Sequence, residues 1–157
     1  MKEYLDALEQ SLTKKLSLLD AILEKSKEQE QLLGQTDLAP DVFEQNVNEK
    51  AALIEELERY DKGFDEVYAR IRKEIDQNRE KYRTEIGRLQ DLIRKITARS
   101  ASIRSTEARN KELAQRKFTT IRKQIRDSRS SAEAVNRYYQ SMTRMNVVDP
   151  QFMDDKH

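Results

Sequence analysis

The stretch Gly34-Gln35-Thr36-Asp37-Leu38-Ala39-Pro40 decides how this chain folds. Glycine commonly follows the last residue of a helix, and proline cannot continue a helix that arrives from upstream. Before this stretch, apolar residues recur every three or four positions, at Leu5, Leu8, Leu12, Leu16, Leu19, Ile22 and Leu23. This spacing is typical of one face of a helix. The sequence therefore predicts a first helix over residues 2–34, followed by a turn.

A second helix is predicted over residues 41–76. Asp41 is a candidate N-cap, and Glu44 stands three residues later as its capping-box partner. The apolar face of this helix keeps the same spacing, at Val47, Ala51, Ile54, Leu57, Phe64, Tyr68, Ile71 and Ile75. Asp61 interrupts this face, and Gly63 lies inside the helix at a modest cost in stability.

The chain is expected to reverse direction at residues 76–80. Asp76-Gln77-Asn78 is a polar, turn-capable stretch that precedes the return of the apolar spacing at Tyr82. A single helix from residue 41 to about residue 135 would be roughly 140 Å long. Such a helix would leave most of its apolar face bare unless it dimerised, whereas a reversal allows burial within one chain.

A third apolar face runs through the remainder of the chain. It begins with Tyr82, Ile86, Leu89, Leu92, Ile93 and Ile96 and continues with Ile103, Asn110 and Leu113. Small and polar residues fill positions 97–106, so this part of the seam should bury the least area. The apolar spacing returns at Phe118, Ile121, Ile125, Ala132, Val135, Tyr139, Met142 and Met145. Asp149-Pro150 ends any helix, which leaves residues 147–157 as a flexible tail.

The helix lengths predict that the last helix is too long for the bundle. The first two helices are about 48 and 54 Å long, so they cover a third helix only over residues 80–115. We expect an all-α fold: an elongated, coiled-coil-like antiparallel three-helix bundle over residues 1–115, with a projecting, partly mobile amphipathic helix over residues 116–146. Exposed apolar faces usually mark binding surfaces, and methionines adapt to irregular partners. Alternatively, Ser128-Arg129-Ser130-Ser131 forms a turn and a fourth short helix completes the core.

Composition argues against an enzyme. The chain has 157 residues, no cysteine, three glycines and a single histidine, His157. It therefore lacks a thiol nucleophile, a histidine-based acid–base or metal site and a glycine-rich phosphate loop. We expect no catalytic residues, no cofactor and no metal. There is no signal-peptide core and no run of about 20 apolar residues, so we expect a cytosolic protein without membrane insertion.

Charge is divided unevenly along the chain. Residues 1–78 hold 11 basic and 19 acidic residues, whereas residues 79–137 hold 17 basic and 7 acidic residues. Either the two halves lie side by side and attract each other, or the basic half binds nucleic acid or an acidic partner. The basic residues from Arg116 to Arg126 occupy several sides of a helix, so they form no single nucleic-acid surface. We expect the basic half to complement residues 41–76, and we expect no nucleic-acid partner.

Four short motifs carry a resemblance to a known family. They are Lys50-Ala51-Ala52-Leu53-Ile54-Glu55-Glu56-Leu57, Glu107-Ala108-Arg109-Asn110-Lys111, Tyr138-Tyr139 and Phe152-Met153-Asp154-Asp155-Lys156. Together with the leucine-striped first segment, they resemble the FlgN family of flagellar type III export chaperones over nearly the whole chain. The resemblance implies a cytosolic, ATP-independent chaperone that holds hook–filament junction proteins, FlgK-like or FlgL-like, before export.

The resemblance also implies roles for the C-terminal residues. In that family the C-terminal amphipathic region binds the helical C-terminus of the client. Client binding would then fall on the eight apolar residues from Phe118 to Met145 named above. A C-terminal tyrosine contributes to docking on the export gate, FlhA, and this role would fall on Tyr138 or Tyr139.

A homo-oligomeric structural coiled coil is the alternative to a chaperone. In that interpretation the apolar face after residue 116 is a self-association seam instead of a client site. The chaperone interpretation predicts a monomer or a weak homodimer, which light scattering across concentration distinguishes from a tight, elongated dimer.

Overall fold

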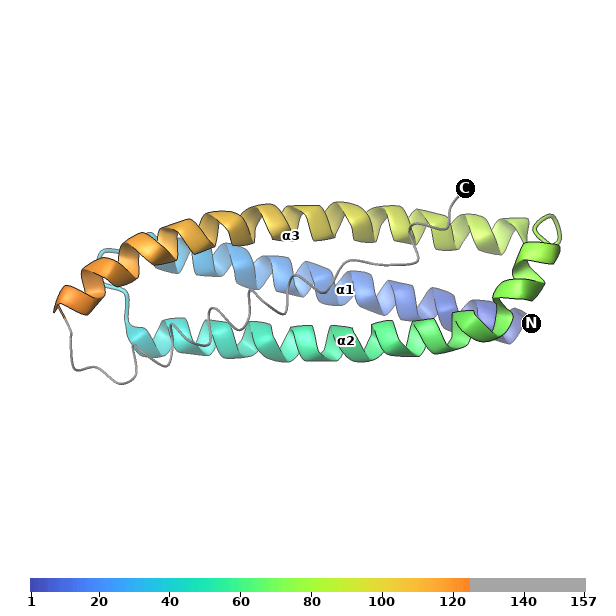
Figure 1. Ribbon diagram of the computed structural model, residues 1–157, viewed down its shortest axis with the longest axis horizontal. Coiled ribbons are helices and arrows are strands. Elements are labelled where there is room, and N and C mark those ends of the chain that lie inside the picture. Colours follow the sequence, from blue (N-terminus) through green and yellow to red (C-terminus); the bar gives the residue numbers. More distant parts are fainter. Residues whose placement is uncertain (125–157) are drawn as a thin grey trace.

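The computed structural model describes residues 1–124, and these residues form three helices. Helix α1 spans Lys2–Leu33, α2 spans Pro40–Gln77 and α3 spans Arg83–Gln124. The helices run along the long axis of the molecule, and α1 lies between α2 and α3 in Figure 1. Residues 1–124 contain no strand, so the expected all-helical bundle is confirmed. The amphipathic helix and the tail that were expected beyond Gln124 lie outside the described residues.

Pairs of side chains show the directions of the helices. The α1–α2 pairs run in opposite order along the two helices: Lys15 with Asp61, and Gln29 with Asn46. The α1–α3 pairs run in the same order: Glu9 with Arg88, and Glu30 with Arg109. Consecutive helices are therefore antiparallel, and α1 is parallel to α3. Helix α1 packs along both of its neighbours, whereas α2 and α3 approach each other less closely.

Helix α2 begins one residue earlier than the sequence predicted. Pro40 is its first residue, and Ala39 before it has an extended backbone (φ −75°, ψ 123°) and forms no side-chain cap. The predicted capping box of Asp41 and Glu44 is therefore wrong. Proline suits the first helical position, because the N–H group that it lacks would have no partner there.

Residues 78–82 form the reversal between α2 and α3, close to the predicted range of 76–80. Asn78 donates from Nδ2 to the backbone oxygen of Glu74 (2.9 Å), at the end of α2. Tyr82 is buried, and its hydroxyl donates to Glu74 Oε2 (3.2 Å). Both ends of the turn are thus bonded to Glu74, near the end of α2.

Apolar side chains fill the seam in two separate clusters. The long cluster includes Leu5, Leu8, Leu12, Leu19, Ile22, Ile54, Leu57, Phe64, Ile71, Ile96 and Ile103. The end cluster lies where the α1–α2 loop meets α3 and consists of Leu32, Leu33, Leu38, Phe43, Val47, Ala114 and Phe118. Most of these positions follow the alternating three- and four-residue spacing of heptads, which accounts for the coiled-coil-like packing.

The bundle covers α3 further than the helix lengths predicted. Phe118 is buried, and its ring meets the ring of Phe43 edge to face, with 5.3 Å between the centroids. The Lys117 ammonium donates to the backbone oxygen of Gln35 in the α1–α2 loop. The expectation that coverage ends at residue 115 and leaves Phe118 exposed is therefore wrong, because the α1–α2 loop extends the bundle past the end of α1.

Replacing Phe43 by alanine should destabilise the protein by about 3–5 kcal/mol, because loss of a buried aromatic side chain leaves a cavity. Phe43 is 1% exposed, whereas its neighbour Val42 is 49% exposed. Val42→Ala is therefore the matched control, and it should change the free energy of unfolding by less than about 0.5 kcal/mol. Urea denaturation followed by circular dichroism measures both variants. Equal effects would show that the end cluster is not part of the folded core.

Candidate functional site

The structure places the first of the predicted client-binding residues inside the bundle. Phe118 belongs to the end cluster, and Ile121 lies in the last turns of α3. The other predicted site residues lie outside residues 1–124: Ile125, Ala132, Val135, Tyr138, Tyr139, Met142 and Met145. Residues 1–124 therefore form the bundle, and most of the predicted binding segment follows them in the sequence.

A layer of buried polar side chains crosses all three helices beside the end cluster. We call it the polar layer; its residues are at most 4% exposed, and they are Ser26, Gln29, Asn46, Lys50, Glu107 and Asn110. Each helix contributes two of them, three or four positions apart, so that both face the seam. Six polar side chains thus occupy positions that a coiled coil usually fills with apolar ones.

Glu107 lies at the centre of the polar layer. Its Oε1 accepts a hydrogen bond from Lys50 Nζ on α2 (2.6 Å) and another from Ser26 Oγ on α1 (2.6 Å). Lys50 Nζ also donates to Gln29 Oε1 (3.1 Å). One carboxylate therefore joins α3 to both other helices, through charge-assisted bonds that are stronger than neutral ones.

Amide side chains complete the polar layer. Gln29 Nε2 donates to Asn46 Oδ1 (3.0 Å), and Asn46 Nδ2 donates to the backbone oxygen of Lys25 (3.0 Å). Asn110 Nδ2 donates to the backbone oxygen of Ser26 (2.9 Å) and to Gln29 Oε1 (3.2 Å). Every pair of helices is thus joined within the layer. Such contacts specify the register of the helices, because an axial shift would separate the partners.

The polar layer is costly to bury. Burial lowers the pKa of Lys50 from its usual 10.5, and the Glu107 carboxylate opposes that shift. Among the residues that the structure describes, none donates a hydrogen bond to Glu107 Oε2 or to Asn110 Oδ1. A buried acceptor without a donor costs about 1–3 kcal/mol. The layer therefore specifies geometry more than it adds stability.

The apolar spacing of the sequence contained a signal for this layer. On α2, steps of three and four residues lead from Val47 to Lys50 and from Lys50 to Ile54. The predicted face used Ala51 instead, because alanine is apolar and lysine is rarely buried without a partner. The structure buries Lys50 and leaves Ala51 partly exposed. An unbroken heptad count would have placed the lysine in the seam.

A second polar contact explains the aspartate that interrupts the apolar face of α2. Asp61 Oδ1 lies 2.5 Å from Nζ of Lys15, a buried residue of α1. Burial raises the pKa of Asp61 above its usual 3.8, and Lys15 opposes this shift. Asp61 is therefore a contact between two helices and not a defect in the apolar face.

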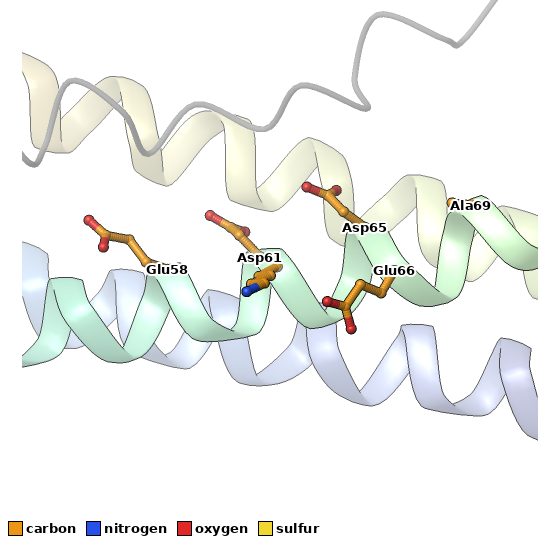
Figure 2. A pocket seen from close by; sticks show the side chains of 6 residues that line it. Glu58, Asp61, Asp65, Glu66 and Ala69 are labelled. Carbon is orange, nitrogen blue, oxygen red and sulfur yellow. The ribbon is translucent and has the colours of Figure 1, made fainter.

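A pocket on α2 includes Asp61, and Figure 2 shows the side chains that line it. All of its lining residues come from this one helix: Glu58, Asp61, Lys62, Asp65, Glu66 and Ala69. The carboxylates of Glu58, Asp61 and Asp65 project from one side of α2, and that of Glu66 projects from another. In the described part of the chain, no group of three or more His, Cys, Asp or Glu is placed to hold a metal ion. The residues that line the pocket therefore form an acidic strip on the surface of α2.

Ion pairs join the basic α3 to the acidic α1. They link Arg88 with Glu9 (2.8 Å), Arg99 with Asp20, and Arg109 with Glu30 (3.2 Å). The partners advance in equal steps along the two helices, as parallel packing requires. The two oppositely charged parts of the chain therefore lie side by side. In these pairs α3 is complemented by α1, whereas the charge pattern had pointed to residues 41–76.

Comparison with known proteins identifies the family. The family model described as FlgN protein matches residues 1–146. The chain belongs to the FlgN family. It therefore has the general role of that family, which is that of a flagellar export chaperone. No curated protein and no solved structure matches the chain.

Two of the motifs that resemble the FlgN family meet in the polar layer. Lys50 begins one motif, and Glu107 and Asn110 belong to the other. The 2.6 Å bond between Lys50 and Glu107 brings them together across α2 and α3. In this FlgN-family protein, these charged residues are thus internal contacts between helices. Over residues 1–124, none of its helices is both long and apolar enough to span a membrane.

Replacing Lys50 by methionine should destabilise this FlgN-family protein by about 3–5 kcal/mol, because the buried Glu107 carboxylate loses its counter-charge. The double variant Lys50→Met/Glu107→Leu removes both charges and should recover most of that loss. Lys25→Met is the control: Lys25 pairs with the exposed Glu49 (3.2 Å), so the loss should stay below about 1 kcal/mol. Chemical denaturation measures all three variants. Equal losses for Lys50→Met and Lys25→Met would contradict the buried charge pair.

The raised pKa of Asp61 predicts a specific pH dependence. The folded carboxyl group binds its proton at higher pH than the unfolded one, whose pKa is 3.8. The stability that Asp61 contributes is therefore present below this value and is lost as the pH rises through the folded pKa. Relative to Asp61→Asn, which does not titrate, the wild type should gain stability as the pH falls from about 7 to about 4. Denaturation at a series of pH values measures this difference. A wild-type advantage that shrinks on acidification would contradict the prediction.

Proposed function

We propose that this protein binds flagellar hook–filament junction proteins, FlgK-like or FlgL-like, through the amphipathic segment that follows its bundle. The client would contact the apolar face of that segment, formed by Ile121, Ile125, Ala132, Val135, Tyr139, Met142 and Met145. Phe118, which the sequence placed on the same face, would anchor the segment to the bundle through the end cluster. The protein would act in the cytoplasm, before export.

The observation that carries the proposal is that α3 continues as a helix beyond Phe118, which the end cluster buries. Phe118 belongs to the end cluster, and α3 extends to Gln124. The sequence continues the apolar spacing beyond this point, from Ile121 to Met145. An apolar face of this length is typical of a binding surface, and methionines adapt to varied helical partners. An amphipathic client helix fits such a face through anchors three and four residues apart.

The proposed mechanism is to cover the helix through which the client would otherwise assemble. A covered helix cannot pack against its neighbours in the filament, so the client stays unassembled until export. No ATP is required, because burial of apolar surface on both partners supplies the free energy of binding. Release at the export gate would then expose the same helix for assembly.

Docking on the export gate is the second part of the proposal. Tyr138 or Tyr139 would contact an FlhA-like gate protein. A tyrosine suits this role, because its ring buries apolar area while its hydroxyl keeps a hydrogen-bond partner. Neighbouring residues of a helix lie about 100° apart around its axis, so in a helical segment one tyrosine would face the gate while the other faces the client.

Removing residues 125–157 should abolish client binding and leave the bundle folded, because the cut keeps the end cluster and Phe118 intact. In the full-length chain, Val135→Asp should weaken binding by about tenfold or more, because it places a charge on the apolar face. Glu133→Ala is the matched control, because this residue is off the apolar spacing, and its affinity should stay within about twofold. Calorimetry with the C-terminal helix of a FlgK-like protein measures affinity, and circular dichroism measures folding.

A truncated protein that binds the client normally would place the client site on the bundle. The tyrosines are tested in the full-length chain with Tyr138→Ala and Tyr139→Ala. One of the two should lose binding to the cytoplasmic part of an FlhA-like protein while it still binds the client. Retention of gate binding by both variants would exclude these residues from docking.

A further inference from the structure

We propose that the polar layer divides the bundle into two parts that open separately. The end section comprises residues 32–45 and 111–120, which hold every member of the end cluster except Val47. The long section comprises the parts of the three helices on the other side of the polar layer. The end section opens while the long section stays folded, and this opening stops at the polar layer.

The first observation is that polar-layer residues lie between the two apolar clusters on all three helices. The nearest apolar residues of the long section are 0% exposed, and they are Ile22, Ile54 and Ile103. The facing residues of the end cluster are Leu33, Phe43 and Ala114, and Val47 of the same cluster lies between Asn46 and Lys50, within the layer. Each of these residues on both sides lies three or four positions from a polar-layer residue on its own helix. The buried apolar residues form two separate clusters. Continuous apolar packing is what usually couples the opening of one region to that of another, and here it is interrupted by polar side chains.

The second observation is that the two clusters differ in size. Among the residues whose burial the structure describes, 1–120, the long cluster holds 15 buried residues, whereas the end cluster holds seven, one of which is the small Ala114. Hydrophobic stabilisation is roughly proportional to the apolar area that is removed from water. The end section should therefore open more often than the long section.

The third observation is that the bonds of the polar layer give the opening a limit. Release of α3 beyond Asn110 leaves both bonds of Glu107 Oε1 in place, to Lys50 (2.6 Å) and to Ser26 (2.6 Å). Opening beyond Glu107 breaks both bonds at once and leaves the Lys50 ammonium without the carboxylate. Charge-assisted networks of this kind resist partial disruption. Opening should therefore halt at the layer and not spread gradually along the seam.

The consequence for function rests on the proposed client site. Helix α3 leaves the end section towards Gln124 and the predicted client-binding segment. If the end section opens separately, the last turns of α3 can be repositioned when a client binds, while the long section maintains the fold. The division itself is a property of the free protein, so it can be tested without a client.

Amide hydrogen exchange of the full-length protein, measured by mass spectrometry without a client, tests the proposal. Peptides from residues 36–45 and 113–120 should exchange about tenfold or more faster than peptides from residues 12–22 and 89–103. Equal exchange rates in the two sections would overturn the proposal. Because no client is present, that result would leave the proposed function untouched.

Two variants sharpen the test. Ile96→Val lies in the long section and should speed exchange there by about two- to tenfold while leaving the end section unchanged. Equal acceleration of both sections by this variant would show a single cooperative unit and overturn the proposal. In the Lys50→Met/Glu107→Leu background the polar layer no longer separates the two sections. Ile96→Val should then accelerate amide exchange in both of them. If that double variant fails to fold, the comparison of wild type with Ile96→Val still decides the question.

Discussion

The Lys50 ammonium reaches the Glu107 carboxylate across the seam between α2 and α3, with 2.6 Å between donor and acceptor and almost no exposure to water. Leucine and isoleucine faces with heptad spacing can pack in several registers, because one aliphatic layer resembles the next. A buried charge is compatible with far fewer registers, since any register that separates it from its partner leaves it unpaired. The remaining contacts of the polar layer reinforce the same register on α1. The alignment of all three helices therefore depends on this pair.

The position of the end cluster follows from that alignment. With the register set, the α1–α2 loop reaches over α3, and Phe43 meets Phe118 edge to face. The core of the bundle therefore includes Phe118, about one turn beyond the limit that helix lengths alone suggested. For a chaperone that is proposed to bind through the segment after the bundle, this burial removes Phe118 from the apolar residues available to a client.

Much of the fold could be predicted from local patterns. The apolar spacing indicated three helices, and Pro40 and Asn78 lie at the helix ends where a breaker and a polar turn were expected. The errors share one cause. Whether Lys50 or Ala51 faces the seam depends on whether a distant residue can neutralise a buried lysine. Whether α1 or α2 pairs with the arginines of α3 depends on how the three helices pack together. Neither is a property of a local stretch of sequence.

By itself, the sequence determined the helical class, the two chain reversals and the family resemblance. It could do so because helical periodicity and the effects of glycine and proline extend over only a few residues. The family motifs are also short and can be recognised in the sequence without a structure. Only the tertiary structure decided which polar residues are buried and that Phe118 belongs to the core. Those features depend on contacts such as that of Lys50 with Glu107, which lie 57 positions apart in the chain. Burying a charge is favourable only when its partner has already been brought close, and that proximity exists only in the folded bundle.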